Sequence, residues 1–108
     1  MQFVQASGAS IPAIGLGTWE LEGRDCARVV EQALKLGYRH IDTAQIYGNE
    51  REVGAGLRAS GVRRDDVFVT TKVWTTHFAP NDLERSVKES LGKLRLADVD
   101  LLLLHWPN

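Results

Sequence analysis

Residues 67–73 read Val67-Phe68-Val69-Thr70-Thr71-Lys72-Val73, a run of β-branched and aromatic residues that is typical of a β-strand. Two comparable runs flank it along the chain, at residues 39–44 and at residues 99–105. Each run is short, β-branched or apolar, and bounded by turn-forming residues. The last run contains four consecutive leucines and is apolar on both faces, as expected of a strand covered by helices.

Helical patterns separate these strands. They span about residues 25–36, 50–60 and 82–95, and each places apolar side chains at helical spacing on one face. Asp25 is the expected N-cap of the first helix, and Asn49 opens the second with a capping-box-like signal. The first two helices are each followed by a glycine, which favours a helix end.

The remaining elements lie at the amino-terminal end. Residues 2–13 are expected to form a β-hairpin around a turn-rich centre, and residues 14–19 a further short strand. The order is then a hairpin followed by β-α-β-α-β-α-β, an alternation that predicts a parallel sheet. Gly54 and Gly56 are expected to let the second helix pack closely on that sheet.

Composition excludes several classes of protein. The 108 residues are 44% hydrophobic and 25% charged, which argues against disorder. Thirteen Lys and Arg against 14 Asp and Glu give a net charge of −1, without the basic excess that nucleic-acid binding needs. The longest apolar run, residues 101–104, is far shorter than a membrane span. The first residues turn polar at once, so we expect no secretory leader and a soluble, cytoplasmic protein.

Metal and disulfide sites are not expected. Cys26 is the only cysteine, so no disulfide forms within the chain. His40 and His77 have no partner ligands at metal-like spacing. Cys26 lies near a helix start, where its pKa is expected to be slightly lowered if the thiol is accessible. We favour a buried structural thiol instead.

Two parallel architectures compete, an open doubly wound sheet and part of a (β/α) barrel. A doubly wound nucleotide-binding sheet carries a G-x-G-x-x-G turn after its first strand. Residues 15–20 read Gly15-Leu16-Gly17-Thr18-Trp19-Glu20, with glutamate in place of the third glycine. The fingerprint therefore fails, and the barrel is favoured.

The placement of polar residues supports the barrel as well. Asp42 lies in the second strand of the parallel set, Lys72 near the end of the third, and His105 closes the fourth. Tyr47 follows Asp42 in the next loop. In such barrels, catalytic groups project from the carboxyl ends of the strands. We expect these four side chains to converge on one rim of the sheet.

Four stretches together resemble a known family. They are Gly15–Trp19, the stretch 37–50 with its Asp-Thr-Ala-Gln-Ile-Tyr core, Thr71–Trp74, and His105-Trp106-Pro107. In this order and spacing they are similar to the aldo-keto reductase family, and within it to the bacterial 2,5-diketo-gluconate reductases. The resemblance covers essentially the whole chain and implies an NADP-dependent oxidoreductase that reduces an aldehyde or ketone, such as a keto sugar, to an alcohol.

The resemblance implies a tetrad of Asp42, Tyr47, Lys72 and His105. Carbonyl reduction needs a proton on oxygen, and a phenol is a weak acid that a nearby cation makes stronger. Lys72 is suited to be that cation, with Asp42 holding it by ion pairing. Tyr47 is then the proton donor, and His105 positions the carbonyl oxygen or shuttles a proton. The hydride belongs to the nicotinamide cofactor.

The resemblance also implies the residues around the tetrad. The expected cofactor contacts are Gly17, Thr18 and Asp42, and the expected walls of the substrate pocket are Trp19, Trp74 and Trp106. The expected partner is a small carbonyl substrate, with no nucleic acid, membrane or metal.

Length changes the expected domain count. A complete (β/α)8 barrel takes about 250 residues and eight strands, whereas this α/β chain supplies a hairpin, four strands and three helices. We expect residues 1–108 to be the N-terminal half of one barrel domain, a TIM half-barrel, with no second domain. Such a half exposes edge strands and is expected to be inactive alone, associating with itself or with a C-terminal half. Two alternatives remain: a self-associating half-barrel module with an idle tetrad, and a cofactor-binding protein without catalysis.

Overall fold

The computed structural model describes residues 2–105, except for the side chain of Thr75. The chain begins with an antiparallel hairpin of β1 (Phe3–Ala6) and β2 (Ala9–Pro12), as the sequence predicts. Ser7 and Gly8 connect the strands with φ of 47° and 82°, the left-handed geometry that a two-residue hairpin turn requires.

The main sheet is parallel and has four strands. They are β3 (Leu16–Gly17), β4 (His40–Asp42), β5 (Phe68–Trp74) and β6 (Leu101–His105), and they lie in the sheet in the order of the chain. This arrangement confirms the predicted parallel α/β class.

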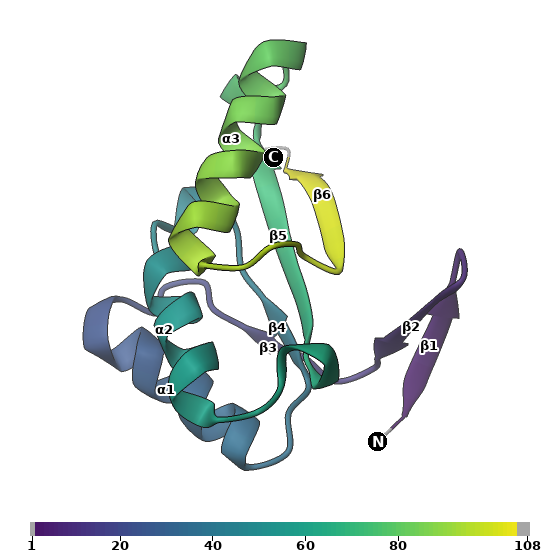
Figure 1. The fold of residues 1–108 in the computed structure, drawn as a ribbon, viewed down its shortest axis with the longest axis vertical. Coiled ribbons are helices and arrows are strands. Elements are labelled where there is room, and N and C mark those ends of the chain that lie inside the picture. Colours follow the sequence, from purple (N-terminus) through teal and green to yellow (C-terminus); the bar gives the residue numbers. More distant parts are fainter. Residues whose placement is uncertain (1, 106–108) are drawn as a thin grey trace.

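Three helices alternate with these strands: α1 (Gly23–Lys35), α2 (Glu50–Ser60) and α3 (Pro80–Leu94). Residues 2–105 also contain three single 3-10 turns, η1 (Gln45–Tyr47), η2 (Arg64–Asp66) and η3 (Thr75–His77). Figure 1 shows all three helices on one face of the sheet and the β1–β2 hairpin standing on the other side.

The core lies between the helices and the sheet. Successive residues of a strand point to opposite faces. Ile41 and Val69 therefore pack under the helices, whereas Asp42 and Lys72 lie on the opposite face. The fully buried apolar side chains of the core include Val30, Leu34, Ile41, Val53, Val69 and Leu94. Packing on the helix-covered face holds the strands in place. Because side chains alternate along each strand, the polar groups Asp42 and Lys72 point to the other face of the sheet.

Both predicted N-caps need correction. Helix α1 begins after Glu22, so Asp25 lies in its first turn instead of capping it. Its carboxylate still faces the positive end of the helix dipole. Asn49 does precede α2, but its side chain makes no capping hydrogen bond. The glycines expected to end α1 and α2 are found as predicted, at Gly37 with φ of 110° and Gly61 with φ of 73°.

The prediction that Gly54 and Gly56 pack on the sheet is wrong. They face the neighbouring helices. A Cβ atom on Gly56 would lie 2.6 Å from the carbonyl oxygen of Ala27 and 2.7 Å from Cβ of Val30, both on α1. A Cβ atom on Gly54 would collide with the backbone of Leu94 at the end of α3. The two glycines therefore set how closely α2 approaches both other helices.

The leucine run is less covered than its sequence predicts. Strand β6 lies at the edge of the described sheet, and Leu102, Leu103 and Leu104 are 39%, 40% and 55% exposed. A run that is apolar on both faces is typical of a central strand. In residues 2–105 it has a neighbouring strand on one side only.

Cys26 is fully buried, as favoured from the sequence. Burial, and secondarily the nearby Glu52 carboxylate, raises the pKa of the Cys26 thiol to about 11. The alternative of a lowered pKa at the helix start is therefore wrong.

We expect the folded protein to resist alkylation at Cys26. A pKa raised from 9.0 to about 11 lowers the thiolate fraction at pH 8 by about 100-fold, and thiolate is the reactive form. Iodoacetamide labelling followed by mass spectrometry should show slow modification of native protein and fast modification in urea. Equal rates in the two conditions would contradict the buried thiol.

Candidate functional site

Four polar side chains meet at the carboxyl ends of the parallel strands. Asp42 ends β4, Lys72 lies near the end of β5, and His105 ends β6. Tyr47 comes from η1, the turn that follows β4. Parallel strands present their carboxyl ends at the same edge, which is why residues 63 positions apart in the chain, 105 − 42, become neighbours.

Lys72 lies at the centre of this cluster. Its Nζ donates hydrogen bonds to Oδ1 of Asp42 at 2.6 Å, to the hydroxyl of Tyr47 at 3.3 Å and to the carbonyl oxygen of Thr43 at 3.4 Å. An ammonium group has three N–H donors, and these contacts use all of them. The Lys72 side chain is only 16% exposed, so its orientation is fixed toward the Tyr47 hydroxyl.

His105 lies beside Tyr47 on the same rim. Its ring meets the Tyr47 ring edge to face, with centroids 6.1 Å apart, and meets the Trp74 ring in the same way at 5.2 Å. Its Nδ1 atom is buried and has no hydrogen-bond partner within residues 2–105. A buried polar atom without a partner carries a desolvation cost, so a polar group from outside this part of the chain is expected there.

Gly17 and Thr18, which the family resemblance implies as cofactor contacts, lie next to Asp42. Gly17 pairs in register with Asp42, and a Cβ atom on it would have open space around it. The Thr18 N–H donates to the carbonyl oxygen of Asp42 at 3.0 Å. Thr18 as a whole is fully buried, so Gly17 and Asp42 are the predicted cofactor contacts that remain accessible in this structure. A cavity of about 390 Å³ borders Gly17 and Asp42 on one side and Val4, Ile11 and Pro12 of the hairpin on the other.

The structure describes two of the three tryptophans that are expected to wall the substrate pocket. Trp19 follows β3 and is 68% exposed. Trp74 ends β5 against His105. Trp106 lies outside the described residues.

Sequence reasoning missed the role of Asn49, which resembles an ordinary helix start. Asn49 is 1% exposed, and its Nδ2 donates to the carbonyl oxygens of Thr18 at 2.8 Å and Leu21 at 2.9 Å. Its Oδ1 accepts from the hydroxyl of Thr43 at 2.8 Å. One amide thus joins the loop after β3 to the loop after β4.

Gln45 makes the corresponding connection on the other side and was also missed. Its Oε1 accepts from the backbone N–H of Trp74 at 2.9 Å and from Nδ1 of His77 at 3.1 Å. Because the N–H of Trp74 can only donate, the orientation of the Gln45 amide is fixed, and Nδ1 of His77 must carry its proton. Nε2 of Gln45 donates to the Ser86 carbonyl oxygen and to the Ser90 hydroxyl in α3.

Glu50 is a buried carboxylate on the helix-covered face. It accepts hydrogen bonds from the hydroxyls of Thr71 at 2.7 Å and Ser90 at 3.1 Å, and it lies in the first turn of α2. Two hydroxyl donors and the helix dipole compensate its burial. It therefore ties α2 to β5 and α3 without facing the tetrad.

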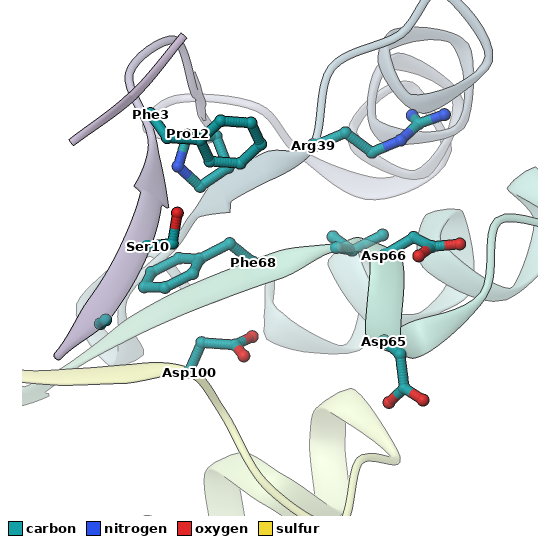
Figure 2. Close-up of a pocket in the computed structure, with 10 residues that line it drawn as sticks. Phe3, Ser10, Pro12, Arg39, Asp65, Asp66, Phe68 and Asp100 are labelled. Atoms are coloured by element: carbon teal, nitrogen blue, oxygen red, sulfur yellow. The ribbon is translucent and has the colours of Figure 1, made fainter. Parts of the chain in front are cut away.

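A second cavity, of about 490 Å³, lies at the opposite end of the sheet. Figure 2 shows Phe3, Ser10 and Pro12 of the hairpin facing Phe68 at the start of β5, with Asp100 below them. Catalytic groups of parallel α/β barrels lie at the carboxyl ends of the strands, and this cavity lies at the amino ends. It is therefore separate from the candidate site.

Within residues 2–105, no three His, Cys, Asp or Glu side chains gather as metal ligands. No helix in that range is long and apolar enough to cross a membrane.

Comparison with known proteins places the chain among reductases. The family model described as "Aldo/keto reductase family" matches residues 13–108. Glycerol 2-dehydrogenase (NADP(+)) of Saccharomyces cerevisiae is 53% identical over 102 residues, which cover 94% of this chain and 32% of that protein. Methylglyoxal reductase DkgB of Yersinia pestis is 50% identical over 99 residues, which cover 92% of this chain and 37% of that protein. The chain spans about a third of the length of the curated relatives that it matches.

Solved structures agree with this result. A crystal structure provisionally identified as a 2,5-diketo-D-gluconic acid reductase B superposes with a TM-score of 0.95 at 56% identity, covering 99% of this chain and 38% of that one. The crystal structure of an aldo/keto reductase from Brucella melitensis superposes with a TM-score of 0.94 at 43% identity. The match covers 97% of this chain and 40% of that one. The parallel sheet and its helices therefore match part of a barrel, as the sequence predicts.

Proposed function

This chain belongs to the aldo/keto reductase family, and we propose that the protein carrying it reduces an aldehyde or ketone to an alcohol with NADPH. The observation that carries the proposal is the position of the Lys72 ammonium, which bridges the Asp42 carboxylate at 2.6 Å and the Tyr47 hydroxyl at 3.3 Å. A cation held against a phenol is suited to proton donation.

Carbonyl reduction adds a hydride to carbon and a proton to oxygen. When bound, a nicotinamide cofactor supplies the hydride. This chain supplies the proton: Tyr47 gives its hydroxyl proton to the carbonyl oxygen as negative charge develops there. Lys72 stabilises the phenolate that remains, because its ammonium lies within hydrogen-bond distance of the same oxygen. Asp42 holds the Lys72 side chain in place by ion pairing.

His105 and the aromatic rings act on the substrate. We assign to His105 a hydrogen bond that positions the carbonyl oxygen beside Tyr47, since the two rings are in edge-to-face contact. Trp74 fixes the His105 ring from the other side and offers an apolar wall. Together with exposed Trp19, it favours a small carbonyl compound with some apolar surface.

The residues on the rim fit a nicotinamide cofactor. Gly17 leaves open space beside Asp42, because nothing lies within 4 Å of a Cβ atom built on it. Gly17 and Asp42 are the groups proposed to hold it, and buried Thr18 supports them through the hydrogen bond from its N–H to the Asp42 carbonyl oxygen. NADP is proposed because the yeast relative is named as an NADP(+) enzyme.

The same comparison supports a domain assignment. Residues 1–108 are proposed as the N-terminal half of one barrel domain, because the matched structures continue well beyond the aligned part. The exposed leucines of β6 are then a surface on which further strands pack.

A reductase assay on the full-length protein that carries this chain tests the proposal. We expect oxidation of NADPH, followed by absorbance, that depends on added methylglyoxal or a keto sugar and runs faster than with NADH. NADPH binding in a fluorescence titration without turnover of any carbonyl would instead indicate a cofactor-binding protein. Self-association without binding, seen by light scattering, would indicate a structural module.

A further inference from the structure

We propose that Gln45 and Asn49 are positioning residues that hold the Tyr47 turn in place, Asn49 from the cofactor side and Gln45 from the substrate side. The inference rests on the proposed function and adds to it a division of labour between two amide side chains. Within residues 2–105, no side-chain hydrogen bond joins Gln45 or Asn49 to a side chain of the tetrad, so both act through the loops they hold.

The turn that carries Tyr47 has little support of its own. It is one 3-10 turn, closed by Tyr47 N–H to the Ala44 carbonyl oxygen at 3.1 Å and Gly48 N–H to the Gln45 carbonyl oxygen at 3.2 Å. Hydrogen bonds of 3-10 geometry are weaker than those of an α-helix. Gly48 then reverses the chain with φ of 70°. The position of the Tyr47 hydroxyl must therefore be set by contacts outside the turn.

Asn49 supplies these contacts on the cofactor side. Its amide N–H groups hold the carbonyl oxygens of Thr18 and Leu21, the two ends of the loop that contains Trp19 and Glu20. Glu20 has φ of 66°, a left-handed conformation that costs energy in a residue with a side chain. Asn49 thus holds a strained loop directly after Gly17, next to the proposed nicotinamide site.

Gln45 supplies the corresponding contacts on the substrate side. Its Oε1 accepts hydrogen bonds from the backbone N–H of Trp74, the last residue of β5, and from the ring of His77, the last residue of η3. The Trp74 ring packs against His105. The two donors of Gln45 anchor the same amide to α3. A shift of Gln45 therefore moves the aromatic wall relative to Tyr47.

Only an amide can make both sets of contacts, because it donates and accepts at one end. A carboxylate in place of Asn49 would face two carbonyl oxygens that it cannot bind. In place of Gln45, a carboxylate would keep the Trp74 and His77 contacts, lose the one to the Ser86 carbonyl oxygen, and accept from the Ser90 hydroxyl only if that hydroxyl stops donating to Glu50. The two positions therefore predict different responses to the same chemical change.

Steady-state kinetics of the full-length protein tests the proposal with Asn49→Asp, Gln45→Met and Gln45→Glu. Misplacement of about 1 Å costs up to about 100-fold in rate. We expect Asn49→Asp to raise KM for NADPH by about 10-fold or more with KM for the carbonyl nearly unchanged. Gln45→Met should raise KM for the carbonyl and leave KM for NADPH nearly unchanged. Gln45→Glu should keep KM for the carbonyl close to the wild-type value, since glutamate still accepts from the N–H of Trp74. Asn81→Asp, on exposed α3 surface, is the matched control.

Folding is checked by thermal melts followed by circular dichroism, and Asn49→Ser replaces Asn49→Asp if that variant does not fold. Variants of an active enzyme that leave both KM values unchanged overturn the inference, as do variants that raise both equally in step with lost thermal stability. Wild-type protein that neither binds NADPH nor reduces a carbonyl overturns the proposed function, and the inference with it.

Discussion

Replacing Tyr47 with phenylalanine is expected to lower kcat for carbonyl reduction by about 100- to 10,000-fold, the contribution typical of a positioned proton donor. The variant removes only the hydroxyl that Lys72 contacts at 3.3 Å. The ring can keep its edge-to-face contact with His105, so the fold and the KM for NADPH should change little. Steady-state kinetics and a fluorescence titration with NADPH measure these quantities.

Tyr38→Phe is the matched control, because Tyr38 is the other tyrosine of the chain and lies partly exposed before β4. It should leave kcat unchanged. Activity of Tyr47→Phe within a few-fold of wild type would show that the proton comes from another group, and the tetrad would need reassignment.

Replacing Gly56 with alanine is expected to destabilise the protein by about 1–3 kcal/mol, the usual cost of overpacking. The added Cβ would lie 2.6 Å from the Ala27 carbonyl oxygen and 2.7 Å from Cβ of Val30, so α1 and α2 must separate. A decrease in the free energy of unfolding would be informative, because alanine ordinarily stabilises a helix relative to glycine by about 1 kcal/mol. Urea unfolding of the full-length protein measures the change.

Gly92→Ala supplies the comparison within the same fold. A Cβ atom on Gly92 in α3 would meet nothing within 4 Å, so this variant should gain up to about 1 kcal/mol. If Gly56→Ala stabilises as much as Gly92→Ala does, the close approach of α1 and α2 is not a tight constraint.

The rim of polar groups could be predicted because it follows from short-range rules. Strand alternation places Asp42 and Lys72 on the face opposite Ile41 and Val69, and parallel order places both strand ends together. These rules require only the identity and direction of each strand. The positions of Asp42, Lys72 and His105 could therefore be predicted from the strand pattern, whereas their roles were implied by the family resemblance.

The amide contacts could not be predicted in this way. Asn49 binds Thr18 across 31 residues of chain, and Gln45 binds Trp74 across 29. An asparagine before a helix has the same local sequence whether it caps that helix or reaches another loop. The exposure of Leu102–Leu104 follows from the number of strands, since a half-barrel exposes its edge strands, whereas the leucine run alone does not reveal whether its strand is central or at an edge.

The strand order of the main sheet has a consequence for how the chain folds. Each of β4, β5 and β6 pairs with the strand that precedes it in the chain, across a connection that contains one α-helix. Contacts between neighbouring units close short loops, which favours fast folding relative to sheets built from distant segments. Each unit can thus dock on a finished neighbour during synthesis on the ribosome, and the growing edge of the sheet moves forward with the nascent chain.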